Sequence, residues 1–135
     1  YERYLHHRID ELSLRDHVEL PGRKTPCDIT TMLNAADLFA LASTSEGWCN
    51  AIAESLACGC PVVATDVGGN RELMNDWGLG RLAPLDDSTA LTEHICWCLS
   101  EKWDRGKIAE YGSRRSWQQV ARECVDVFRR IAKID

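Results

Sequence analysis

Apolar and polar residues alternate along the chain with two different periods. Apolar positions three and four residues apart predict amphipathic helices. Stretches of this kind lie at 1–12, 26–36, 47–58, 91–99 and 117–131. Short apolar or alternating runs next to turn-forming residues predict strands. These runs are His17–Leu20, Leu38–Ala42, Pro61–Thr65 and Gly80–Ala83. Because strands and helices alternate, the sequence predicts an α/β fold with a mainly parallel sheet.

Local signals place the ends of several helices. Thr25 can cap the helix that starts at Pro26, and Asp28 can reach back to the amide of the capping residue. Asp87 stands where a capping aspartate is expected before the helix over 91–99. The helix over 47–58 should end at Gly59, which favours helix termination.

Composition and charge exclude several classes of protein. The 135 residues include 44% hydrophobic and 27% charged side chains, which is typical of a single globular domain. The net charge of −5 argues against nucleic acid as a partner. Residues 1–100 carry a net −8 and residues 101–135 a net +3. The basic last quarter fits a solvated helix face, and the alternative is peripheral contact with an anionic membrane.

The cysteines and histidines predict no metal centre and no nucleophilic hydrolase. The seven cysteines are an odd number, lie mostly among apolar helical residues and lack the spacing of a zinc site. We therefore expect reduced thiols and a cytoplasmic protein. The four histidines do not cluster, and no pattern of serine or cysteine with histidine is present.

Two loops carry the candidate chemistry, because ligands of parallel α/β sheets bind beyond the carboxyl ends of the strands. Ser43–Gly47 follows one predicted strand, and Asp66–Asn70 follows the next. The first loop leads into a helix whose unpaired amides and positive dipole end suit a phosphate. Gly47 has no Cβ, so an anion can approach its backbone closely.

Two glutamates flank this helix start. Glu46 lies in the loop, and Glu54 lies four residues after Asn50 and therefore on the same helix face. A carboxylate at the position of Glu54 suits the two neighbouring hydroxyls of a ribose, because it accepts two hydrogen bonds at once. The pattern favours a nucleotide diphosphate that carries a further group near Glu46. Chance spacing, with a simple dipole contact for the first glutamate, explains the same pattern.

Residues 43–73, S-T-S-E-G-W-C-N-A-I-A-E-S-L-A-C-G-C-P-V-V-A-T-D-V-G-G-N-R-E-L, resemble the donor-binding half of family 4, or group 1, retaining glycosyltransferases. These enzymes have the GT-B fold and a motif of two glutamates with seven residues between them. The flanking V-E-L-P-G, A-A-D-L-F-A-L-A-S and S-W-Q-Q-V-A are also similar, so the resemblance covers essentially the whole chain. Cys49 and Ser55 depart from the commonest pattern, and both are small.

The resemblance implies a role for each matching residue. Glu46 would contact hydroxyls of the donor sugar as the candidate catalytic residue, and Glu54 would bind the ribose. Backbone amides would hold the sugar and the diphosphate, and two glycines would let the second loop pass close to the pocket. The implied donor-binding residues are Glu46, Gly47, Trp48, Cys49, Asn50, Ala51, Glu54, Gly68 and Gly69, with Arg23, Lys24 and Thr25 as weaker candidates near the base. Trp48 would either line the sugar pocket or shield the loop.

The resemblance also implies a Rossmann-like parallel sheet with flanking helices, of which residues 1–135 form part of a C-terminal donor-binding domain. The family's first two strand–helix units and its N-terminal acceptor domain have no counterpart in this sequence. The implied reaction transfers a hexosyl group with retention from a nucleotide diphosphate sugar to a hydroxyl of a glycan or lipid-linked acceptor, with no metal or other cofactor. Two alternatives stay open, a nucleotide-sugar-binding module without turnover and a sugar-nucleotide epimerase.

Overall fold

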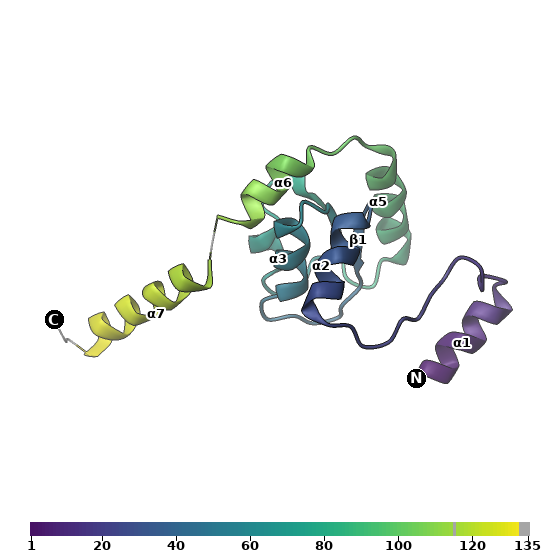
Figure 1. Cartoon of the computed structure of the whole chain (residues 1–135), viewed down its shortest axis with the longest axis horizontal. Helices are drawn as coiled ribbons and strands as arrows, with labels where there is room; N and C mark the ends of the chain where they lie inside the picture. The colour runs from purple at the N-terminus through teal and green to yellow at the C-terminus, as the bar shows by residue number, and fades with distance from the viewer. Residues whose placement is uncertain (115, 133–135) are drawn as a thin grey trace.

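The computed structural model describes residues 1–114 and 116–132, with the side chain of residue 77 left out. These residues form a central α/β body with one helix beyond it at each end of the chain (Figure 1). The α-helices are α1 (Glu2–Glu11), α2 (Pro26–Ala35), α3 (Asn50–Ala57), α4 (Asn70–Leu73), α5 (Ser88–Ser100), α6 (Arg105–Gly112) and α7 (Trp117–Ala132). The strands are β1 (Phe39–Leu41), β2 (Val62–Thr65) and β3 (Gly80–Ala83), and a short 3₁₀ turn, η1, covers Trp77–Leu79.

The three strands form a parallel sheet in the order β1-β2-β3. Phe39 pairs with Val62 across the first ladder, and Val62 pairs with Gly80 across the second. Helix α5 packs on β2 and β3, whereas α3 contacts β2 and packs on α6. Figure 1 shows α5 on one side of the strands and α3 with α6 on the other. This arrangement confirms the predicted parallel α/β layers.

The core lies between the sheet and α3. All four residues of β2 are buried, as expected for a central strand that is covered on both faces. Ile52 and Leu56 of α3 are 0% and 1% exposed and belong to this core. Their burial confirms that the α3 face opposite Glu54 points inward.

The predicted helix caps form, and they explain why these helices start where they do. Thr25 and Asp28 form a complete capping box at α2. Hydrogen bonds from the Thr25 hydroxyl and backbone amide lower the pKa of the Asp28 carboxyl. Asp87 accepts a hydrogen bond from the amide of Ala90 at the start of α5. Each cap satisfies amides that would otherwise have no partner.

The side chain of Arg105 joins α2 to the far part of the body. The Arg105 guanidinium donates hydrogen bonds to the carbonyls of Leu33, Asn34 and Ala36, at distances of 3.1, 3.0 and 2.6 Å. These carbonyls belong to the last turn of α2 and to its C-cap residue Ala36, where helix carbonyls have no partner within the helix. Arg105 therefore caps α2 from the first turn of α6.

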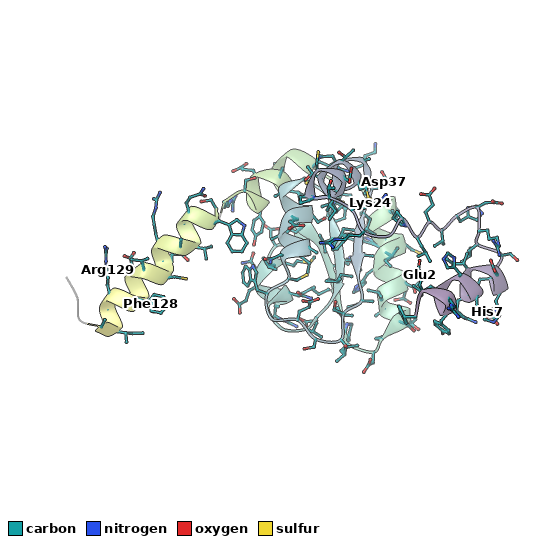
Figure 2. All side chains as sticks on the ribbon, turned by 60° about the horizontal axis from the view of Figure 1, so that its bottom comes forward. Glu2, His7, Lys24, Asp37, Phe128 and Arg129 are labelled. Carbon is teal, nitrogen blue, oxygen red and sulfur yellow. The ribbon has the colours of Figure 1, made fainter. Side chains whose placement is uncertain are left out.

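The two terminal helices differ from the body because neither contains a buried residue. Figures 1 and 2 show α1 and α7 at opposite ends of the molecule, with the labelled Phe128 on α7 far from the sheet. Phe128 is 68% exposed and Trp117 is 73% exposed. The apolar stripe that predicted α7 is therefore present as a helix face, but none of its described residues is buried.

The strand predicted at His17–Leu20 is wrong. These residues form a turn followed by irregular backbone, and all four are exposed. A strand needs a neighbouring strand to hydrogen bond with it, and the described residues place no strand beside this segment. The alternating pattern alone therefore does not make this segment a strand.

All seven cysteines are free, as the sequence predicted. Cys98 is 1% exposed, and burial raises its pKa to about 11, because a thiolate is poorly solvated inside the protein. Burial also raises the pKa of the Cys60 thiol, against a smaller opposing effect of a hydrogen bond with Ser55. These thiols pack as small apolar groups.

Candidate functional site

The candidate site lies at the carboxyl edge of the sheet. β1 leads into residues 42–49 and β2 leads into residues 66–69. Because β1 and β2 are parallel neighbours, both loops leave the sheet at the same edge. The structure therefore brings together the two loops that the sequence singled out.

The loops touch through backbone atoms. The amide of Gly69 donates a hydrogen bond to the carbonyl of Gly47 at 2.9 Å. Gly68 has a φ of +52°, and a Cβ at this residue would lie 1.7 Å from the carbonyl oxygen of Glu46. A Cβ on Gly69 would lie 2.7 Å from the carbonyl oxygen of Gly47. The second loop can approach the first this closely only because Gly68 and Gly69 lack a side chain.

Polar side chains add a second connection between the loops. The hydroxyl of Thr65, the last residue of β2, donates a hydrogen bond to the carbonyl of Ser43. The hydroxyl of Ser43 donates to Oε1 of Glu46 at 2.7 Å. Glu46 is half-buried, and its carboxylate thus has a partner that fixes its direction.

The start of α3 is exposed at Gly47 and Asn50, whereas the side chain of Cys49 between them is buried in the core. Gly47 is exposed, and a Cβ built on it meets no atom within 4 Å. Cys49 is the N-cap residue, and no side chain accepts a hydrogen bond at the cap. Asn50 is also exposed. The first-turn amides of an uncapped helix carry partial positive charge, so this end can receive an anionic group.

Glu54 extends this open face along the helix. Its side chain is exposed, and it lies one turn after Asn50. Ala51 follows Asn50 and is half-buried. A group bound at the helix start and extending along α3 would therefore meet the carboxylate of Glu54.

Trp48 lies where the two loops meet. A Cβ on Gly69 would be 3.3 Å from the Trp48 ring, yet the tryptophan is 44% exposed. The ring covers part of the second loop and still presents a flat apolar surface beside the helix start.

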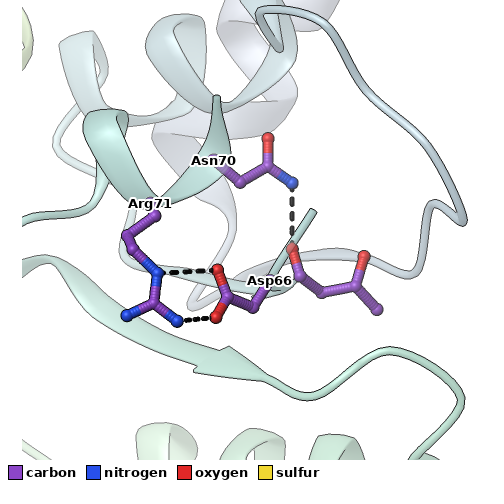
Figure 3. A network of polar contacts seen from close by, with 4 residues as sticks. Asp66, Asn70 and Arg71 are labelled. Atoms are coloured by element: carbon purple, nitrogen blue, oxygen red, sulfur yellow. Dashed lines mark hydrogen bonds and ion pairs between the residues drawn. The ribbon is translucent and has the colours of Figure 1, made fainter. Parts of the chain in front are cut away.

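A polar network stabilises the second loop (Figure 3). Arg71 binds both carboxylate oxygens of Asp66, with 3.1 Å between its Nε and Oδ1. The hydrogen bond with Asp66 raises the pKa of the Arg71 guanidinium. Asn70 is fully buried, and its amide group donates to the carbonyl of Thr65 at 3.0 Å. The turn from β2 into α4 is thus anchored at both of its ends.

The weaker candidates near the base are not joined to this site. Arg23, Lys24 and Thr25 are exposed and precede α2. The Thr25 hydroxyl is engaged in the capping box with Asp28. No hydrogen bond or ion pair connects the three residues to Glu46, Gly47 or Glu54 in the described chain.

Within residues 1–114 and 116–132, no group of three or more histidine, cysteine, aspartate or glutamate side chains could hold a metal ion. Across the same residues, no helix has the length and apolar character that crossing a bilayer requires.

The family of the chain follows from comparison with known proteins. Residues 1–115 match the family model described as glycosyl transferases group 1. The chain belongs to this family. It is 37% identical over 101 residues to the glycosyltransferase WcaL of Escherichia coli, covering 70% of this chain and 25% of that protein. It is 29% identical over 124 residues to the D-inositol 3-phosphate glycosyltransferase of Corynebacterium urealyticum, covering 89% of this chain and 29% of that enzyme.

Solved structures of glycosyltransferases share the fold. HepE of Anabaena in complex with UDP-glucose superposes with a TM-score of 0.69 at 31% identity, covering 98% of this chain and 36% of HepE. A glycosyltransferase of Rickettsia africae superposes with a TM-score of 0.86 at 22% identity, covering 99% of this chain and 37% of that protein. This group 1 chain spans about a quarter to a third of the length of the curated relatives it matches. The Rossmann-like α/β fold of GT-B glycosyltransferases, which the sequence predicted, is confirmed.

Sequence reasoning overlooked the residues that support Glu46 and the second loop. Ser43 and Thr65 hold Glu46 in place, and Asn70 with the Asp66–Arg71 pair anchors the neighbouring loop. One signal was available for Ser43, because it precedes Glu46 by three residues in a tight loop, where serine commonly bonds to nearby polar groups. The contact between Thr65 and Ser43 spans 22 residues and left no local signal.

Proposed function

We propose that the chain binds the donor of a retaining glycosyltransferase that moves a hexosyl group from a nucleotide diphosphate sugar to an acceptor hydroxyl. The observation that carries the proposal is the exposed start of α3, where Gly47 faces free space and stands between Glu46 and Glu54 in the sequence. Membership in the group 1 family and likeness to HepE, which was solved with UDP and with UDP-glucose, support a nucleotide sugar as the ligand.

Each element of the site has a role in this proposal. The amides of residues 47–51 hold the diphosphate and the sugar, and they stabilise the negative charge of the leaving group without a metal. Glu54 accepts hydrogen bonds from the ribose hydroxyls, and Glu46 accepts them from the sugar. Trp48 either lines the sugar pocket or shields the loop. Gly68 and Gly69 keep the second loop close to the pocket. Arg23 and Lys24 remain candidates for the base.

The reaction of the whole protein is part of the same proposal. Transfer to a glycan or lipid-linked acceptor needs an acceptor site, and retention of configuration needs the acceptor on the same face as the leaving group. We assign neither to residues of this chain. Contact of the basic residues in 101–135 with an anionic membrane surface, at the cytoplasmic side, would suit a lipid-linked acceptor.

Replacement of Glu54 tests the proposal. Glu54→Gln keeps the size of the side chain but weakens its hydrogen bonds to the ribose, so affinity for both UDP and UDP-glucose should fall about tenfold. Isothermal titration calorimetry of the 135-residue chain with each ligand measures this change. Glu93→Gln, on the exposed surface of α5, is the matched control and should bind as the unchanged chain does. Equal affinities for the unchanged chain and Glu54→Gln would reject the ribose role.

Binding without transfer by the same chain, when an acceptor alcohol is supplied, would favour the alternative of a binding module that needs a partner domain. Absence of any binding by the unchanged chain would contradict the donor-site proposal itself.

A further inference from the structure

We propose that Ser43 is a positioning residue that fixes the Glu46 carboxylate for the donor sugar, an inference that rests on the proposed function. Ser43 lies two residues after β1, and its hydroxyl reaches forward to Oε1 of Glu46 at 2.7 Å. A hydrogen bond from a hydroxyl to a charged carboxylate is short and strong, and it selects one orientation of the acid. Ser43 acts on the sugar through Glu46 and makes no contact with it.

Ser43 is itself held in place from the neighbouring strand. The Thr65 hydroxyl donates to the Ser43 carbonyl, and Thr65 is 6% exposed at the end of β2. On the other side of Glu46, the amide of Gly69 donates to the carbonyl of Gly47 at 2.9 Å. The backbone on both sides of Glu46 is thus hydrogen bonded to the end of β2 and the loop that follows it. These bonds fix the position of Glu46 relative to the sheet.

The hydrogen bond from Ser43 uses one carboxylate oxygen of Glu46 and leaves the other oxygen for the sugar. Ser43 donates its single hydroxyl hydrogen to Oε1. In the part of the chain that the structure describes, no other group donates to Glu46, so Oε2 can accept from a sugar hydroxyl. A free glutamate side chain loses rotamer freedom when it binds, and that loss weakens affinity. Because Ser43 orders Glu46 before the sugar arrives, this loss is smaller.

The test compares two ligands that differ only in the sugar. UDP-glucose carries a hexose and UDP does not, so a defect in positioning Glu46 should affect the first ligand alone. Ser43→Ala should weaken UDP-glucose binding to the 135-residue chain about tenfold and leave UDP binding unchanged. Ser43→Thr retains a hydroxyl and should recover most of the lost affinity. Ser45→Ala, at an exposed serine of the same loop, is the matched control and should change neither affinity.

A double-mutant cycle isolates the route through Glu46. Glu46→Ala removes the side chain that accepts from Ser43, so adding Ser43→Ala to it should weaken UDP-glucose binding by no further amount. If Ser43→Ala also lowers the melting temperature sharply, Thr65→Val is used in its place, because it removes the hydroxyl that holds Ser43. This variant should weaken binding of UDP-glucose by a smaller amount and leave UDP binding unchanged.

Four results would overturn the inference. Unchanged UDP-glucose affinity in Ser43→Ala shows that the serine does not position Glu46, and an equal loss for both ligands shows that it only supports the loop. Additive losses in the double mutant show an effect that bypasses Glu46. If the unchanged chain binds neither ligand, the proposed function fails first, and the inference falls with it. The ligand pattern of the unchanged chain therefore distinguishes the two failures.

Discussion

The loop after β1 and the loop after β2 both depend on glycine, but for opposite reasons. In the second loop, Gly68 and Gly69 are surrounded, because a Cβ on either would overlap backbone atoms of the first loop. In the first loop, Gly47 faces open space and has no contact that a Cβ would disturb. The second loop therefore needs glycine to fold, whereas the folded chain alone gives no reason for glycine at position 47.

This difference separates residues that build the site from residues that serve a ligand. Packing does not require glycine at position 47, yet this residue lies at an exposed helix start. A ligand that binds there best explains it. The comparison leads to three predictions, ordered by the size of the effect that we expect.

Gly68→Ala should cause the largest loss. Gly68 has a φ of +52°, which side chains rarely adopt, and a Cβ here would lie 1.7 Å from the Glu46 carbonyl oxygen. The alanine would therefore force the two loops apart. We expect the free energy of unfolding to fall by about 3 kcal/mol. Urea denaturation followed by circular dichroism measures this change. Gly106→Ala, where a Cβ meets only the Asp104 carboxylate at 3.4 Å, is the control and should not destabilise the chain. A stable Gly68→Ala variant would contradict the tight approach of the loops.

Gly47→Ala should leave stability within about 0.5 kcal/mol, because its Cβ enters free space and its surroundings are unchanged. Affinity for UDP-glucose should nevertheless fall about tenfold, since the added methyl group separates the diphosphate from the α3 amides. Thermal melting and calorimetry on the same preparation measure the two effects, with Gly106→Ala again as the control. Full affinity in Gly47→Ala would remove the distinction between the two loops.

Arg71→Gln should have the smallest effect. The Arg71 side chain is 76% exposed, and the attraction within an exposed ion pair is screened by solvent, so such pairs contribute little to stability. We expect only a slight loss of stability in urea denaturation, and this loss should shrink at high salt. A loss as large as that in Gly68→Ala would mean that the Asp66–Arg71 pair, rather than backbone fit, holds the second loop.

Much of the body could be predicted from the sequence because its signals are local. The apolar runs predicted β1, β2 and β3 to within one residue at each end, and the capping box of Thr25 with Asp28 predicted the start of α2. The helical period placed Ile52 and Leu56 on the buried face of α3. Such features depend on residues a few positions apart.

The rest depends on contacts between distant residues. His17–Leu20 has a strand-like pattern, but no described strand lies beside it. The stripe of α7 predicted the helix, but it could not predict that Trp117 and Phe128 stay exposed. For the candidate site, the motif predicted the two glutamates and the glycines. The bond from Thr65 to Ser43 could not be predicted, because it needs the relative position of two strands.

The Arg105 cap has a consequence for how α2 opens. Helix α2 has one buried residue, Leu33, and its last carbonyls are held by a side chain 69 to 72 residues further along the chain. Closing so long a loop carries an entropic cost, so this attachment depends on the rest of the body to hold Arg105 in place. The amides of α2 should therefore exchange with solvent as one group, at a rate set by release of the contacts that Arg105 and the Cys60 thiol make with its last carbonyls.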